Sequence, residues 1–110
     1  MTDYIEVRTT IDSRSGALKI AESLVARHLA ACVQVSGPMT STYWWQQHVE
    51  QAEEWLCVAK TRADRFAALE QAIKELHPYA IPEIIATAIV AGNIGYLEWI
   101  EQATMPNVGE

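Results

Sequence analysis

The segment 77–83 carries the side chains best suited to chemistry. It combines a titratable ring at His77, a phenol at Tyr79 and a carboxylate at Glu83. Pro78 and Pro82 bracket these side chains and fix the backbone. A rigid helix-to-strand connection would by itself explain the two prolines. A simple connection between a helix and a strand does not require three such polar side chains. We therefore interpret this loop as part of a binding site.

Donors for a metal ion are scattered along the chain. None of the histidines and cysteines forms a pair at metal-ligand spacing; they are His28, His48, His77, Cys32 and Cys57. Because Cu²⁺ heads the affinity order for imidazole sites, we predict weak binding of Cu²⁺ or another divalent cation through His77 or His48. No cofactor is expected to be obligatory.

Catalytic groups are not grouped in the sequence. Neither Cys32 nor Cys57 has a histidine and a carboxylate beside it, as nucleophilic catalysis requires. An acid pair from Glu53, Glu54 and Glu83 is conceivable, but carboxylates near a hairpin are usually solvated. There is also no glycine-rich phosphate loop. We therefore predict a binding protein and not an enzyme.

The composition is that of one acidic globular domain. The chain has 110 residues, 50% hydrophobic and 20% charged, and its net charge of −6 repels a phosphate backbone, so nucleic acid is not an expected partner. No apolar segment approaches the roughly 20 residues that cross a bilayer, and the N-terminus lacks the pattern of a signal peptide. We expect a cytoplasmic protein with one domain at 1–103 and a tail at 104–110.

The periodicity of the first half predicts a strand, a helix and a long hairpin. Residues 4–9 alternate like a half-buried strand, and apolar residues repeat at helical spacing up to about residue 30, after a cap at Asp12 or Ser13. Residues 32–45 read as one strand with a kink at 37–38. A polar connection at 46–54, with Gln47 and His48 at its tip, leads to a strand at 55–61.

The second half predicts a helix, a strand and a last helix. Residues 63–76 have one apolar stripe, and His77 and Pro78 end the helix. The apolar run at 81–91 suits a central strand, and Asn93 caps a helix that reaches residue 100. Residues 105–110 are expected to fray.

This order of elements predicts an α+β, ferredoxin-like βαββαβ sandwich with an extra C-terminal helix. The long hairpin carries Tyr43, Trp44, Trp45 and Trp55, and it exceeds what so small a domain can cover. Exposed aromatic strands invite edge-to-edge association. We therefore expect another chain to cover them.

Four segments resemble the divalent-cation tolerance (CutA) family, and they occur in the right order between the predicted elements. They are LAACV at 29–33, STYWW at 41–45, EEWLCVAKT at 53–61 and HPYAIPEI at 77–84. The resemblance implies a ferredoxin-like subunit in a tight homotrimer, a likeness to the PII signalling proteins, and a link to copper and divalent-metal tolerance. Members proposed to coordinate copper can carry a cysteine and a histidine where this chain has Arg8 and Leu76.

We predict a ligand pocket between subunits, to which the family motifs contribute. It is built from Lys60, His77, Tyr79 and Glu83, with Cys32, Tyr43 and Trp45 from the side of the long hairpin. Lys60 would attract a small anionic ligand, and the aromatic residues would supply apolar walls. The alternative is a structural trimer that scaffolds a partner protein and has no ligand of its own.

Overall fold

The computed structural model describes residues 3–105, and its centre is one antiparallel sheet. Strand β1 is Tyr4–Ile11, β2 is Cys32–Trp45, β3 is His48–Arg62 and β4 is Ile85–Ala88. Their order across the sheet is β2-β3-β1-β4. Together with the two helices that connect them, this is the predicted ferredoxin-like sandwich.

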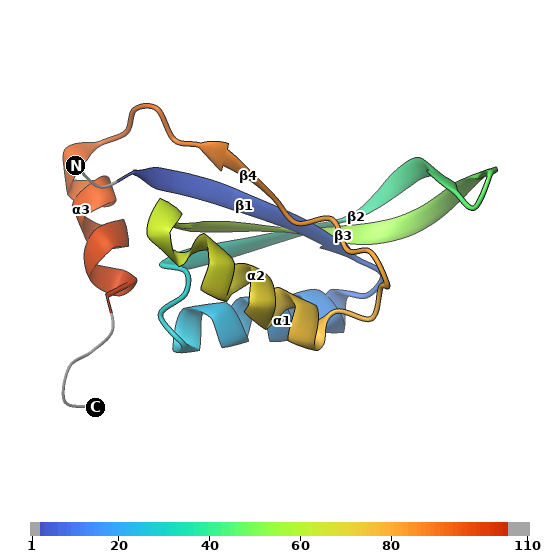
Figure 1. The fold of residues 1–110 in the computed structure, drawn as a ribbon, viewed down its shortest axis with the longest axis horizontal. Helices are drawn as coiled ribbons and strands as arrows, with labels where there is room; N and C mark the ends of the chain where they lie inside the picture. The colour runs from blue at the N-terminus through green and yellow to red at the C-terminus, as the bar shows by residue number, and fades with distance from the viewer. Residues whose placement is uncertain (1–2, 106–110) are drawn as a thin grey trace.

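Helices α1 (Arg14–Ala26) and α2 (Phe66–Leu76) cover one face of the sheet, as Figure 1 shows. Their apolar stripes meet the strands in a single core, whose members include Ala17, Ile20, Leu24, Leu69, Ile73, Val7, Cys57 and Ala59. The opposite face carries the alternate strand residues and has no helix over its middle. Burial on one face only is typical of antiparallel sheets.

The predicted helix ends are confirmed at three places. The Ser13 side chain accepts a hydrogen bond from the Gly16 N–H and caps α1, and Asn93 caps α3 (Ile94–Ala103) through the Tyr96 N–H. Helix α2 ends at Leu76, directly before His77. A 3₁₀ turn, Ala63–Arg65, precedes α2.

Helix α1 ends earlier than residue 30. His28 has a φ of 57°, which takes the chain out of the right-handed helical region. The amide of Leu29 then bonds back to the Leu24 carbonyl at 2.9 Å. These bonds close the helix and let Leu29 point into the core.

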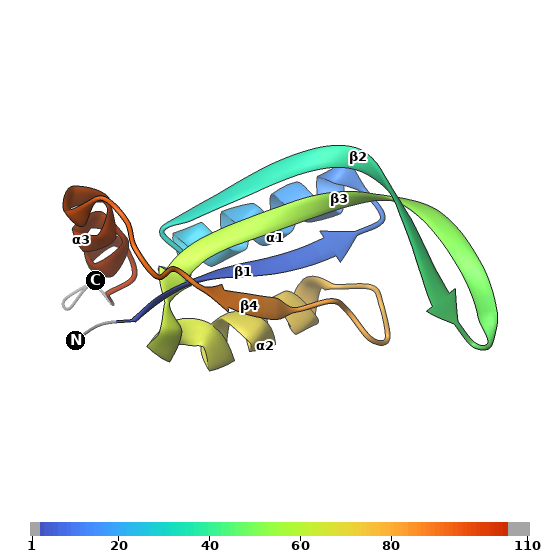
Figure 2. The ribbon, with the colours of Figure 1, turned by 90° about the horizontal axis from the view of Figure 1, so that it is seen from above.

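The long hairpin has a shorter loop than predicted. Its loop is Gln46 and Gln47 alone, with φ values of 48° and 70°, and β3 begins at His48, which pairs with Trp45. Residues 48–54 are therefore strand and not connection. They show no apolar alternation because the end of the hairpin projects beyond the helices (Figure 2), and residues 48–51 and 53 are exposed.

The apolar run at 81–91 is not a central strand. Only Ile85–Ala88 pairs, it pairs with β1 at the edge of the sheet, and all four residues are exposed. Pro82 cannot donate to a strand ladder, and the chain before β4 forms a loop across the end of the sheet. Of the predicted tail, Thr104 is buried, while 106–110 lie outside the described residues.

Candidate functional site

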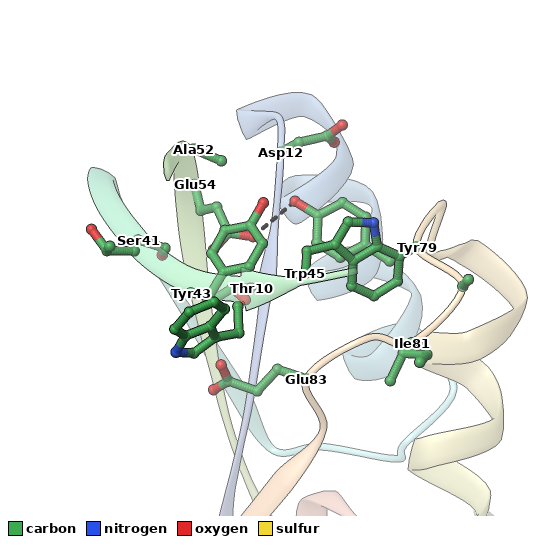
Figure 3. Close-up of a pocket in the computed structure, with 13 residues that line it drawn as sticks. Thr10, Asp12, Ser41, Tyr43, Trp45, Ala52, Glu54, Tyr79, Ile81 and Glu83 are labelled. Atoms are coloured by element: carbon green, nitrogen blue, oxygen red, sulfur yellow. Dashed lines mark hydrogen bonds between the residues drawn. The ribbon is translucent and has the colours of Figure 1, made fainter. Parts of the chain in front are cut away.

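A cavity of about 920 Å³ lies between the outer part of the hairpin and the loop that follows α2. The hairpin supplies one wall, the loop supplies the other, and Thr10 and Asp12 at the end of β1 lie between them (Figure 3). The cavity therefore gathers residues from segments far apart in the chain. A volume of this size is within the usual range for small-molecule sites.

The pleat of the hairpin determines which of its side chains reach this cavity. Tyr43 pairs with Glu50, Ser41 with Ala52 and Met39 with Glu54. Side chains two positions apart share a face of a strand. The same face of the hairpin therefore presents Ser41, Tyr43 and Trp45 from β2 with Ala52 and Glu54 from β3.

His77 anchors the loop wall from beneath. Its Nε2 lies 2.7 Å from the Thr10 carbonyl oxygen, and its Nδ1 lies 3.2 Å from the backbone nitrogen of Tyr79. A carbonyl only accepts and an amide N–H only donates. The ring is therefore the neutral tautomer with its proton on Nε2, and both of its nitrogens are occupied.

Tyr79 and Glu54 link the two walls. The Tyr79 hydroxyl donates to Glu54 Oε2 at 2.8 Å, and the His77 and Tyr79 rings meet edge to face at 4.6 Å between centroids. Burial raises the pKa of the Tyr79 phenol above its ordinary value, and the hydrogen bond to Glu54 and the charges of Glu54 and Asp12 raise it further. The phenol therefore remains a hydrogen-bond donor at neutral pH.

The structure brings four of the predicted ligand residues into this cavity: Tyr43, Trp45, Tyr79 and Glu83. His77 does not line it but holds Tyr79 in place. Lys60 and Cys32 lie elsewhere: they pair across β3 and β2, about 20 Å along β3 from Glu54. The Lys60 ammonium donates to Gln34 Oε1 at 2.6 Å.

Sequence reasoning misses two of the three carboxylates that line the cavity, Glu54 and Asp12. It weighs Glu54 as a member of an acid pair and favours a solvated charge, yet this residue is 6% exposed, and it treats Asp12 as a helix cap. Alternation along residues 41–54 could have placed Glu54 on the face of Tyr43 and Trp45. That signal is lost when 46–54 is interpreted as a connection.

The two histidines predicted as metal ligands, His48 and His77, lie far apart. His48 is exposed at the far end of the hairpin, whereas His77 is buried beside the sheet. Within residues 3–105, no three side chains of His, Cys, Asp or Glu are grouped to hold a metal ion. The two cysteines are free thiols, with Cys32 half-buried and Cys57 buried.

Fold and cavity together define a small α+β protein with a projecting hairpin and a cavity beside it. The profile of the family described as CutA1 divalent ion tolerance protein matches residues 5–103, so the chain belongs to this family. No helix within 3–105 is long and apolar enough to cross a membrane.

Relatives and solved structures agree with this assignment. The divalent-cation tolerance protein CutA of Thermus thermophilus is 42% identical over 89% of this chain and 95% of its own length. A solved structure of a divalent cation tolerance protein from Thermus thermophilus has a TM-score of 0.91 at 40% identity, covering 93% of this chain and 99% of its own. The chloroplastic protein CutA 1 of Oryza sativa is 37% identical over 91% of this chain, but only 56% of its own length is matched.

Proposed function

We propose that this protein binds a small ligand in the cavity between hairpin and loop, and that this binding underlies its role in divalent-cation tolerance. The observation that carries the proposal is the double anchoring of the loop. His77 fixes it to Thr10, and Tyr79 fixes it to Glu54 across the cavity. A loop held in this way is preorganised, so little conformational entropy is lost on binding.

We infer that the working form is a homotrimer with an architecture like that of the PII proteins. The support is the uncovered face of the sheet, where Leu56 and Val58 are half-buried and Ile85 is 49% exposed. Apolar residues on an open sheet face favour association. In a trimer, Lys60 and Cys32 of a neighbouring copy would be available to complete the predicted inter-subunit site.

We infer a binding role and not catalysis. Nucleophilic catalysis needs a thiolate or an activated hydroxyl. Burial raises the pKa of the Cys57 thiol to about 11, so this thiol stays protonated. Tyr79 is likewise held protonated within the site.

The direct test is a thermal-shift screen of the purified protein with small molecules and divalent cations. A ligand that binds the folded state stabilises it by RT ln(1 + L/Kd), where L is the ligand concentration, so the unfolding midpoint rises with that concentration. We expect Trp45→Ala to abolish the shift. Val49→Ala, on the same hairpin but outside the cavity, should preserve it. If no compound or cation in the screen raises the unfolding midpoint of the parent protein or of Val49→Ala, the proposal is overturned.

A scaffolding role has one observation in its favour. Trp44 is 74% exposed and pairs with Val49, which is 59% exposed, near the end of the hairpin. Such an apolar pair suits a partner protein. Under this alternative, Trp44→Lys with Val49→Lys would abolish partner binding, and no small molecule would shift the midpoint.

We propose the cytoplasm as the compartment. Free thiols at Cys32 and Cys57 suit a reducing environment. Fractionation of the source cells tests this, and recovery in an exported fraction would contradict it.

A further inference from the structure

We propose that Lys60 of one copy forms an ion pair with Glu54 of the next copy, and that this pair joins the copies at the cavity. The inference rests on the proposed function, because it assumes the homotrimer. It goes further by naming the two groups that meet across the interface. The observations that carry it are the pattern along one face of β3 and the charges at its two ends.

The open face of β3 has an acidic end, an apolar middle and a basic end. Side chains two positions apart share a face of a strand, so four residues form one row on the side of the sheet without helices (Figure 1). They are Glu54, Leu56, Val58 and Lys60. Glu54 lies at the cavity, and Lys60 lies about 20 Å from it along the strand. The row therefore offers another copy an apolar surface with opposite charges at separate places.

Glu54 has no cation in its own chain. The residue is 6% exposed, and its Oε2 accepts the Tyr79 hydroxyl at 2.8 Å. None of the ion pairs within residues 3–105 includes it, and Asp12 and Glu83 add further negative charge to the cavity. A carboxylate removed from water without a cation is costly. A cation from another molecule would offset that cost.

Lys60 has no carboxylate partner among the described residues. Its ammonium donates to the neutral Gln34 side chain at 2.6 Å. Glu6 lies opposite Lys60 on β1, but the two form no ion pair. An ammonium has three N–H donors, so the bond to Gln34 leaves two of them. Lys60 can therefore keep this bond and still donate to a carboxylate of another copy.

The separation of the two charges suits a closed ring. One copy can present its Lys60 to one neighbour while its Glu54 receives the Lys60 of the other neighbour. Head-to-tail contacts of this kind generate a ring of identical interfaces when the rotation closes. In such a ring each cavity has an ammonium from a neighbouring copy beside Glu54. The charge of the ligand site is then set by two chains together.

A double-mutant cycle tests the ion pair. Lys60→Met and Glu54→Gln are made singly and together, and the dissociation of the trimer is measured by sedimentation at one fixed urea concentration. Substitutions about 20 Å apart in one chain have additive effects unless they meet across an interface. We expect the dissociation constant of the double variant to fall short of the additive value by about tenfold per contact. The loss of the bond to Gln34 occurs in both Lys60 variants and cancels in the cycle.

Two further cycles are the controls. Glu53→Gln removes the charge adjacent to Glu54, but Glu53 is exposed and does not line the cavity, so its effect should add to that of Lys60→Met. Arg8 is another basic residue on the open face, opposite Val58, and Arg8→Met should likewise be additive with Glu54→Gln. If Glu54→Gln fails to fold, Glu54→Asp replaces it, because the shorter side chain also lengthens the contact.

The outcomes separate this inference from the proposed function. Additive effects of Lys60→Met and Glu54→Gln in a trimeric protein would overturn the ion pair and leave the homotrimer and its ligand cavity in place. Coupling of Glu54 to Arg8 and not to Lys60 would also overturn it. A monomeric parent protein would overturn the inference together with the proposed trimer. If the cycle shows coupling but the thermal-shift screen finds no ligand, the ion pair stands and the proposed ligand role falls.

Discussion

His77 acts on the cavity without lining it. Its ring joins the end of β1 to the loop wall, because Nε2 bonds to Thr10 and Nδ1 bonds to the Tyr79 amide. Tyr79 in turn reaches Glu54. A metal ion at His77 would have to replace one of the two ring bonds. His48, which is exposed, has no such competition.

The difference between the hydrogen-bonded His77 and the exposed His48 predicts how copper binds. We expect weak, poorly selective Cu²⁺ binding, because imidazole donors favour copper and no ligand group is preassembled in 3–105. His48→Ala should remove most of it, and His77→Ala alone should change it little. Titration calorimetry measures both. Submicromolar affinity that survives the double substitution would show that other residues are the ligands.

Cys57 predicts a pH dependence of stability. Its pKa is raised from the ordinary 9.0 to about 11 because the thiol is buried. The folded state thus holds this proton more tightly than the unfolded chain. The stability that this raised pKa gives the folded state is fully present below about pH 9 and is lost as the pH rises to about 11.

Urea unfolding across this pH range checks the Cys57 effect. We expect the free energy of unfolding to fall less steeply in Cys57→Ala than in the parent protein. Cys32→Ala is the control, because it removes the other thiol, which is half-buried. Identical slopes in all three proteins would contradict the assignment.

At the scale of elements, the hairpin loop has a backbone conformation that its residue types do not favour. Gln46 and Gln47 both have positive φ. A two-residue hairpin loop with positive φ at both positions is a type I′ turn, which favours Asn-Gly. Residues with a longer side chain are strained in this region. The turn therefore costs the hairpin some stability.

Replacing the loop by Asn-Gly should stabilise the protein. We expect Gln46→Asn with Gln47→Gly to raise the free energy of unfolding by about 1 kcal/mol. Chemical denaturation measures the change. Gln51→Gly is the contrasting variant and should lower stability, because it weakens a strand and removes the hydrogen bond to Thr42. A destabilised Asn-Gly variant would argue against the type I′ loop.

The packed helices and the long strand β2 were predictable from sequence, whereas the projecting part of β3 and the edge strand β4 were not. The stripes of α1 and α2 have helical spacing because each buries one face, as Leu69 and Ile73 do. Residues 48–51 and 53 are exposed, so most of this part of β3 has no apolar pattern, although Glu54 at its end is buried. Tyr43 and Trp45 were predictable as site residues because β2 continues through them. Glu54 was missed because residues 46–54 were interpreted as a connection, which hides its place on the same face of the hairpin as Tyr43 and Trp45.

At the scale of the whole molecule, one chain leaves much apolar surface uncovered. Ile81 is 74% exposed, Val90 93% and Ile94 73%, in addition to the hairpin residue Trp44. The exposed residues of β4 and the middle of the open sheet face have no covering helix (Figure 1). Scattered apolar residues are normal on a monomer, but a continuous face is typical of an interface.

We therefore predict that the protein is a homotrimer in solution. Light scattering should give about three times the chain mass of 12.3 kDa at low micromolar concentration. Because dissociation accompanies unfolding, the midpoint of reversible thermal unfolding should rise with protein concentration. A mass of one chain would contradict the prediction.

A charge on the open sheet face should separate assembly from folding. Val58 is half-buried on that face, and Asp at this position would have to be desolvated when copies associate. We expect Val58→Asp to lower the mass toward that of one chain. Leu18→Asp is the control, because Leu18 is 36% exposed on α1, away from the open face, and its substitution should keep the trimer. If both variants remain trimeric, the open face around Val58 is not the interface, and the exposed hairpin residues Trp44 and Val49 are the next to substitute.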